Sequence, residues 1–352
     1  MFTKSIIFKN FKINTNNIKV KNELKLLLKE DNAIIQSLKP TYKNNYNKKK
    51  ISKLKNYSLI RIIGMGGSIL GTESIYNFLK HKIKKSFIFI NNLSSNINLQ
   101  KNKKIFLNLI VSKSGNTLET ISNVSILTNR NDKNVFITEN KNSHISSLAH
   151  LLKEEIIHHN NFIGGRFSVL SEVGMLPAEL MGLNVNKFKQ INNLIKNKKF
   201  INSLINNVSN TIHLVKNKKA NSIILNYDEK SHNLFEWYQQ LVAESLGKKG
   251  KGILPIISTM PKDNHSIMQL YLDGSRNNFF TFFYIHEKNS PKINKKKIFS
   301  SHKYLSNKSI DQIILSQKQA TEKVFINKNL PFRSFEILNR NEKTLGELFC
   351  FF

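Results

Sequence analysis

The chain has 352 residues, 40% of them hydrophobic and 22% charged, which is enough apolar material for about two globular domains. Its 55 Lys and Arg against 23 Asp and Glu give a formal net charge of +32, which on its own suits a nucleic-acid or anionic membrane partner. The lysines are scattered among Asn and Ile, residues of A/T-rich codons, so drift in base composition explains the excess at least as well. We therefore expect neither partner.

The cysteine count and the N-terminal residues indicate the cellular compartment of the protein. The single cysteine, Cys350, excludes an internal disulfide, and no Cys/His set has zinc-binding spacing, so we expect a reducing environment and no metal. Residues 1–10 contain no sustained apolar run, which argues against a signal peptide and a membrane span. The sequence thus predicts a cytoplasmic protein.

Residues 1–50 are polar and are expected to be partly helical. After them, short apolar runs alternate with helical patterns, which is typical of parallel sheets covered by helices. The runs cover residues 59–63, 87–90, 105–111, 135–138, 222–225, 253–257 and 279–285. The Asn- and Lys-rich segment 196–221 interrupts this rhythm. We therefore predict one α/β domain over 51–194 and a second over 195–352, with 286–307 as a loop or insertion.

A glycine-rich turn follows the first apolar run and reads Gly64-Met65-Gly66-Gly67-Ser68. Such a turn exposes backbone N–H groups at a helix N-terminus, where anions bind. A dinucleotide site would place an acidic residue at the end of the next strand, where Asn91 and Asn92 stand. No Gly-Lys-Ser/Thr sequence for a nucleoside triphosphate is present either. The turn therefore favours a simple phosphate ester, with a purely structural turn as the alternative.

A second polar turn follows the run at 105–111 and reads Ser112-Lys113-Ser114-Gly115-Asn116-Thr117-Leu118-Glu119-Thr120. Its hydroxyls, one ammonium and a helix N-terminus would meet in one small volume, which suits the oxygens and charge of a phosphate monoester. The alternative is that the hydroxyls only cap the following helix. Capping needs one hydroxyl rather than several, so we favour phosphate binding.

Together the two turns resemble the sugar isomerase domain and, within it, the glucose-6-phosphate isomerase family. Three more segments agree with that family in the same order, and with the two turns they span about residues 57–285. They read Gly164-Gly165-Arg166-Phe167-Ser168, Glu244-Ser245-Leu246-Gly247-Lys248 and Asn264-His265-Ser266. The resemblance implies two three-layer α/β/α sugar isomerase domains with mostly parallel sheets. It also implies reversible isomerisation of glucose 6-phosphate and fructose 6-phosphate through a cis-enediolate, in glycolysis and gluconeogenesis, without a cofactor.

The resemblance also implies roles for individual residues. Glu244 would carry the proton between C2 and C1, Arg166 would stabilise the enediolate, and His265 would assist ring opening from the partner subunit of a homodimer with shared active sites. Lys113 would serve either the phosphate or the reacting end of the sugar. The residues expected around the phosphate are Gly67, Ser68, Ser112, Ser114, Thr117 and Thr120.

Helical patterns add two expectations about these groups. Glu244 falls at the border of an apolar stripe on a helix over 233–246, and a half-buried carboxylate there suits a base that takes a weakly acidic proton. His265 follows Asp263 and Asn264, which are good N-cap residues. We therefore expect it in the first turn of a helix, where the dipole keeps the imidazole neutral.

The chain ends in an increasingly apolar run that has no helix stop signal. Uncovered, the side chains of Phe349, Phe351 and Phe352 would each forfeit about 1.5–3 kcal/mol of burial. The sequence also stops before a Lys that the family uses in ring opening. We therefore expect a chain interrupted within a helix, or a surface that a dimer partner covers.

Three rival functions remain open on sequence. A related isomerase would also accept mannose 6-phosphate. A non-catalytic sugar-phosphate sensor would need neither Glu244 nor His265. A nucleic-acid binder would show affinity with a steep salt dependence and no sugar selectivity.

Overall fold

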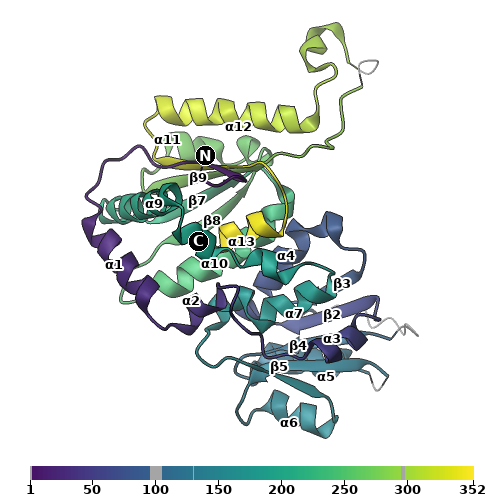
Figure 1. The fold of residues 1–352 in the computed structure, drawn as a ribbon. Coiled ribbons are helices and arrows are strands. Elements are labelled where there is room, and N and C mark those ends of the chain that lie inside the picture. Colours follow the sequence, from purple (N-terminus) through teal and green to yellow (C-terminus); the bar gives the residue numbers. More distant parts are fainter. Residues whose placement is uncertain (1, 96–104, 130, 295–297) are drawn as a thin grey trace.

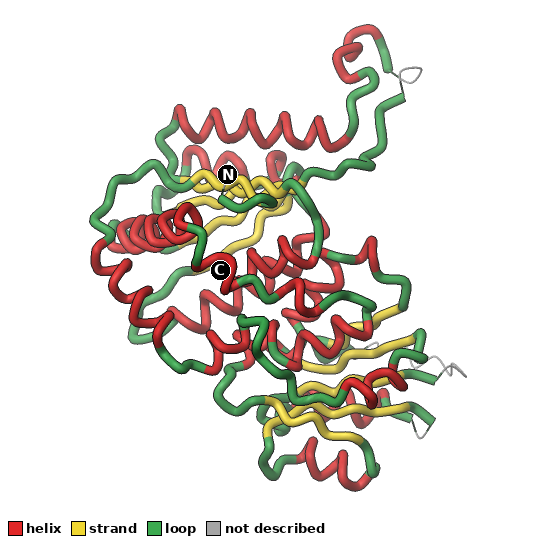
Figure 2. Tube along the Cα trace, in the orientation of Figure 1, coloured by secondary structure: helices red, strands yellow, loops and turns green. Residues whose placement is uncertain are grey.

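The computed structural model describes residues 2–95, 105–129, 131–294 and 298–352, and its strands form two five-stranded sheets (Figures 1 and 2). In the first sheet every pairing is parallel and the order is β3-β2-β4-β5-β6. Its strands are β2 (Leu59–Gly64), β3 (Ser86–Ile90), β4 (Leu107–Val111), β5 (Lys133–Glu139) and β6 (Glu155–His159). The carboxyl ends of these strands therefore share one edge, where the two polar turns begin.

The second sheet has the order β1-β10-β9-β7-β8. Its strands are β1 (Ile6–Lys9), β7 (Asn221–Asn226), β8 (Leu254–Thr259), β9 (Asn278–Ile285) and β10 (Phe332–Ile337). Only β1 is antiparallel, and it pairs with β10. The predicted α/β architecture with mostly parallel sheets is confirmed, whereas β1, β6 and β10 were not predicted.

Helices connect and cover the strands (Figure 1). They are α1 (Ile18–Lys29), α2 (Ala33–Ser37), α3 (Lys48–Leu54), α4 (Leu70–Phe78), α5 (Leu118–Leu127), α6 (His144–Leu151), α7 (Glu172–Leu180), α8 (Ile191–Ile195), α9 (Lys198–Lys216), α10 (His232–Leu246), α11 (Met268–Asp273), α12 (Ile310–Asn327) and α13 (Glu342–Phe351). Within the described ranges, no helix is both long and apolar enough to cross a bilayer.

The segment that interrupts the strand rhythm, 196–221, holds the regular helix α9. The side chain of Asn197 accepts hydrogen bonds from the backbone N–H groups of Lys199 and Phe200 and so caps the helix. Phe200 and Leu214 are buried, so α9 covers the core despite its Asn- and Lys-rich sequence. Segment 286–307 projects from the second sheet, and its described part contains the short 3₁₀ helix Ser300–Leu305 (Figure 1).

The apolar core lies on both faces of each sheet. One large cluster fills the space between the two sheets and includes Ile62 from β2 and Phe335 from β10. Smaller clusters lie on the outer faces, under α5 and α6 on the first sheet and under α11 and α12 on the second. Because both faces are buried, the strands read as continuous apolar runs rather than alternating ones.

The C-terminal phenylalanines lie inside the core, and the expectation that this chain leaves them uncovered is wrong. Phe349 is 5% exposed and Phe351 is 6% exposed, while Phe352 is partly buried against the same cluster. Asn341 caps α13, and the helix fits between the N-terminal segment and the second sheet. The sequence reasoning failed because β1, which supplies part of this cover, was not predicted.

We expect Phe351→Ala to lower the free energy of unfolding by about 3–5 kcal/mol, because it empties a site enclosed by aromatic rings. Those rings belong to Phe2, Phe200 and Phe335. Denaturant unfolding followed by circular dichroism measures the change. Leu151→Ala removes a side chain from a residue that is 78% exposed and serves as the control. Equal stability of both variants would contradict the burial of α13.

Helices α4 and α10 pack side by side and join the two halves of the molecule (Figure 1). Glu73 of α4 is 5% exposed, and its Oε1 accepts a hydrogen bond of 2.9 Å from Asn91. Burial, with a smaller contribution from the charge of Glu236 on α10, raises the pKa of Glu73 to about 7. The folded chain therefore keeps this proton at a pH where the unfolded chain, with an ordinary value of 4.5, has lost it. Stability consequently falls as the pH rises through that interval.

We expect Glu73→Gln to stabilise the chain at about pH 8, by up to about 3 kcal/mol, and to lose most of that gain at about pH 5. Urea unfolding at the two pH values measures it. Glu236→Gln is a control of opposite sign, because the hydrogen bond from His232 lowers the pKa of Glu236 despite partial burial. That variant should lose stability mainly at about pH 5, where His232, whose pKa the same hydrogen bond raises, is charged. A pH-independent effect of Glu73→Gln would refute the burial argument.

Candidate active site

The glycine-rich turn lies against the Gly-Gly-Arg turn. Gly66 has a φ of +52°, in the left-handed region that glycine adopts without strain. A Cβ added to Gly67 would lie 2.2 Å from the carbonyl carbon of Gly165, so only glycine permits this approach. Ser68 closes the 3₁₀ helix Gly66–Ser68 that precedes α4. The close contact of two backbones therefore fixes one wall of the site.

The Ser-Lys-Ser turn forms the opposite wall between β4 and α5. Ser112 Oγ lies 3.2 Å and Ser114 Oγ 3.4 Å from Thr117 Oγ1, so three hydroxyls converge. Thr117 is the N-cap residue of α5 but its side chain makes no capping hydrogen bond. Its hydroxyl therefore bonds the neighbouring hydroxyls rather than the helix end, which favours binding over the capping alternative. Gly115, with a φ of +67°, turns the chain at this point.

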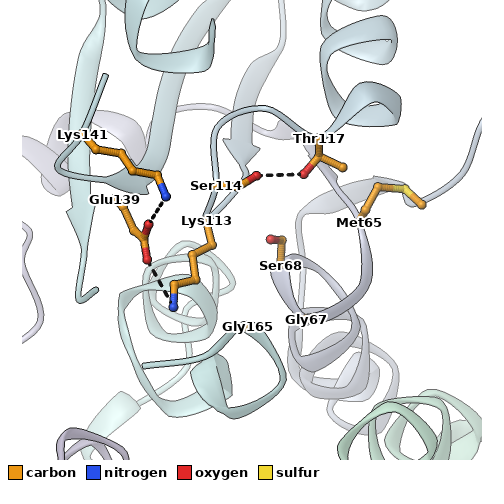
Figure 3. Close-up of a pocket in the computed structure, with 9 residues that line it drawn as sticks. All are labelled: Met65, Gly67, Ser68, Lys113, Ser114, Thr117, Glu139, Lys141 and Gly165. Atoms are coloured by element: carbon orange, nitrogen blue, oxygen red, sulfur yellow. Dashed lines mark hydrogen bonds and ion pairs between the residues drawn. The ribbon is translucent and has the colours of Figure 1, made fainter. Parts of the chain in front are cut away.

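A cavity of about 410 Å³ opens between these walls (Figure 3). Its lining residues are Met65, Gly67, Ser68, Lys113, Ser114, Thr117, Glu139, Lys141 and Gly165. Of the residues predicted to hold a phosphate, Gly67, Ser68, Lys113, Ser114 and Thr117 line it. Ser112 and Thr120 lie behind the wall, each 1% exposed, and Ser112 Oγ accepts a hydrogen bond from the N–H of Gly115. Ser112 therefore supports the loop, whereas the Thr120 hydroxyl has no hydrogen-bond partner among the described residues.

The far side of the cavity carries two lysines that share one carboxylate (Figure 3). Lys113 Nζ lies 3.2 Å from Glu139 Oε1, and Lys141 Nζ lies 2.6 Å from Glu139 Oε2. Burial alone would raise the pKa of Glu139, but hydrogen bonds from Lys141 and Lys113 outweigh it and hold the pKa below its ordinary value. The ionised group carries a single negative charge against two positive ones, so the wall is net positive and suits an anion.

Arg166 extends from the turn that borders the cavity toward the end of α10. Its Nη1 lies 3.0 Å from Glu244 Oε1 and its Nε donates to Ser245 Oγ at 2.9 Å. The guanidinium carbon also lies 4.5 Å from the centre of the Phe167 ring. Two side chains of α10 thus hold the guanidinium next to the cavity.

Glu244 lies in the last turn of α10, as predicted, and its side chain is about half-buried, with 52% of it exposed. Among the described residues, the group that contacts this carboxylate is the guanidinium of Arg166.

His265 is exposed and lies apart from Glu244. It lies in a helix, as expected, but as the last residue of the single-turn 3₁₀ helix Lys262–His265, so the expected capping of that helix by Asp263 and Asn264 is wrong. Asp263 does not cap α11 but accepts hydrogen bonds from the N–H of Thr259 and the hydroxyls of Ser258 and Ser266. His265 follows the carboxyl end of β8, whereas Glu244 lies near the start of that strand. Six strand residues span about 20 Å, so one chain does not bring the two groups together.

Sequence reasoning missed several polar groups of the site. Glu139 ends β5 and Lys141 follows it, and that position at the carboxyl end of a parallel strand was the available signal. Gln240 lies one turn before Glu244 on α10, and a Cβ added to Gly66 would lie 2.8 Å from its Nε2. Its Oε1 is buried without a hydrogen-bond partner among the described residues. Within those residues, no group of three His, Cys, Asp or Glu side chains could hold a metal ion.

The parallel sheets and this net positive, hydroxyl-lined cavity place the chain among α/β proteins that bind small anionic ligands at the carboxyl ends of strands. A profile of the phosphoglucose isomerase family matches residues 12–303. The chain belongs to the phosphoglucose isomerase family.

Individual relatives agree. The chain is 33% identical to a glucose-6-phosphate isomerase of Methanocaldococcus jannaschii, over 92% of this chain and 83% of the relative. It is 31% identical to one of Mycoplasmopsis pulmonis, over 88% of this chain and 80% of the relative.

Solved structures share the fold at low sequence identity. A hypothetical protein of Thermus thermophilus has a TM-score of 0.78 at 18% identity, covering 95% of this chain and 86% of that one. A glucose-6-phosphate isomerase of Chlamydia trachomatis has a TM-score of 0.68 at 17% identity, covering 90% of this chain and 71% of that one.

Proposed function

We propose that the cavity binds the phosphate of a sugar phosphate and that the chain is an aldose–ketose isomerase, which interconverts glucose 6-phosphate and fructose 6-phosphate. The observation that carries this proposal is the adjacency of two elements: a hydroxyl-lined anion cavity and, next to it, the Arg166–Glu244 pair. Lys113 and Lys141 supply positive charge for the phosphate, while Ser68, Ser114 and Thr117 supply hydroxyl donors. The family membership supports the same reaction.

In the proposed chemistry Glu244 removes the proton from C2 of the open-chain aldose and returns it to C1. The electrons left behind form a cis-enediolate, whose negative charge Arg166 stabilises from the position held by Ser245. A second proton moves between the two sugar oxygens, so the isomerisation needs no net oxidant or reductant. The reverse direction uses the same groups in the opposite order.

We further propose a cytoplasmic homodimer in which His265 of one chain assists ring opening in the site of the other. The separation of Glu244 and His265 along β8 supports this arrangement, since both are exposed and a single chain keeps them apart. Light scattering of the purified chain measures the mass of the assembly. A monomer with full activity would refute the shared site.

The test is turnover of fructose 6-phosphate to glucose 6-phosphate by the purified chain, with mannose 6-phosphate assayed in parallel. Turnover of fructose 6-phosphate supports the isomerase, and turnover of both epimers assigns the broader specificity. Saturable binding of either sugar phosphate without turnover would instead assign a sensor. Each outcome gives a different signal, so one set of assays distinguishes the specific isomerase, the isomerase with broader specificity and the sensor.

A further inference from the structure

A buried charge pair lies behind the loop that carries Arg166. His159 ends β6 and is 2% exposed, and Glu172 begins α7 and is fully buried. The imidazole Nδ1 lies 2.7 Å from Glu172 Oε1. The two residues stand at either end of segment 160–171, so the pair closes the base of the loop that contains the Gly-Gly-Arg turn.

The surroundings of the His159 ring assign its protonation. Nδ1 faces the Glu172 carboxylate, and Nε2 lies 2.9 Å from the carbonyl oxygen of Ile163. Both neighbours only accept hydrogen bonds, whereas a neutral imidazole has a single N–H to donate. One tautomer would leave a ring nitrogen facing a buried oxygen without a hydrogen between them. The doubly protonated ring satisfies both contacts.

Glu172 is surrounded by donors that stabilise its negative charge. Besides the ring, Oε1 accepts from the N–H of Asn160 at 2.9 Å, and Oε2 accepts from the hydroxyl of Tyr42 at 3.2 Å. Burial by itself would raise the pKa of Glu172, but the hydrogen bonds from His159 and Asn160 outweigh it and lower the pKa. A buried anion of this kind calls for a buried cation, which the ring supplies.

The pair reaches Arg166 through a short, fixed path. The ring holds the carbonyl of Ile163, three residues before Arg166. The next fixed point is Gly165, whose backbone lies so close to Gly67 that a Cβ on Gly67 would not fit. Beyond it the guanidinium is held by Ser245. A shift of Ile163 would therefore move the backbone from which the arginine extends.

We propose that His159, as an imidazolium paired with Glu172, is a positioning residue that sets the place of Arg166 by holding the Ile163 carbonyl. This inference rests on the proposed function, in which Arg166 stabilises the enediolate. The arrangement gives a role to a charge pair that lies fully buried beside the strand end that carries Glu139.

The test compares Glu172→Gln with Tyr42→Phe in the full chain. The first variant removes the anion at nearly constant shape, and we expect kcat to fall about 10-fold to 100-fold while KM for fructose 6-phosphate changes little. KM is expected to change little because the hydroxyls around the phosphate, those of Ser68, Ser114 and Thr117, belong to other loops. The control, Tyr42→Phe, removes a different hydrogen bond from the same carboxylate and should leave kcat unchanged.

Nuclear magnetic resonance supplies a readout that does not depend on activity. In the wild type both ring nitrogens of His159 should carry protons, and the Arg166 Nε–H signal should shift in Glu172→Gln but not in Tyr42→Phe. A singly protonated ring would overturn the proposal, and so would an Arg166 Nε–H signal that does not shift in Glu172→Gln. The wild-type ring measurement decides even if Glu172→Gln does not fold.

An Arg166→Lys background separates this inference from the proposed function. If the pair acts through Arg166, Glu172→Gln should lower kcat no further in that background. An additional loss there would refute action through Arg166. If Arg166→Lys alone keeps the wild-type kcat, the role proposed for Arg166 fails, while the Nε–H signal still decides the positioning.

Discussion

Glu244→Gln is expected to lower kcat for fructose 6-phosphate by about 10²–10⁴-fold, because the amide cannot take the proton that must move between C2 and C1. KM should change little, since the hydroxyls and lysines of the cavity lie on other elements. The measurement is a coupled assay, together with exchange of substrate hydrogen into solvent, which the variant should also lose.

The matched control for that variant is Glu236→Gln, on the same helix but two turns away, at the contact with α4. It should keep kcat even though it lowers stability. A Glu244→Gln variant that retains wild-type kcat and hydrogen exchange would remove Glu244 from the mechanism and leave the proton carrier to be sought elsewhere in the site.

Mixing two inactive variants is expected to restore activity if the sites are shared between subunits. Glu244→Gln and His265→Ala should each be nearly inactive as pure dimers. In a hybrid dimer, one of the two sites combines an intact Glu244 with an intact His265. Random reassortment should then recover about one quarter of the wild-type activity. Co-refolding of equal amounts, followed by the same coupled assay, measures this recovery.

The control for the mixing experiment is each variant refolded with itself, which should stay inactive. If the hybrid also stays inactive while light scattering shows dimers, His265 and Glu244 act within one chain. The structure favours recovery, because β8 separates the two residues in a single chain.

The first sheet was largely predictable from sequence because its central strands are buried on both faces. Runs such as 59–63 and 135–138 contain little else than apolar residues, and turn residues bound them. Strand β10 was missed for the opposite reason. Its sequence places two polar residues, Arg333 and Ser334, between Phe332 and Phe335, so no continuous apolar run marks the strand. The polar side chains are hydrogen-bonded inside the core, as Arg333 is to Asn207 and Tyr238.

The site residues were predictable where a local motif fixes the backbone. They were not predictable where the packing of distant elements sets the position of a side chain. Gly67 and Thr117 line the cavity because their turns end parallel strands. The contact of Glu244 with Arg166 depends on how the loop that carries the arginine packs against α10, which no local pattern contains. The place of His265 depends on Asp263, whose carboxylate is used by the end of β8 rather than by a helix.

The pairing of β1 with β10 joins strands that are more than three hundred residues apart, and Phe2 packs on Phe351 close to both ends of the chain (Figure 1). A ribosome releases the chain from its N-terminus, so β1 emerges first and has no partner until β10 has been made. The first sheet has no such dependence, since its strands all lie between residues 59 and 159. We expect the first sheet to form during synthesis and the second to close only near its completion. In that interval we expect the apolar side chains of β1 to be exposed, so β1 is the segment that we expect a chaperone to bind.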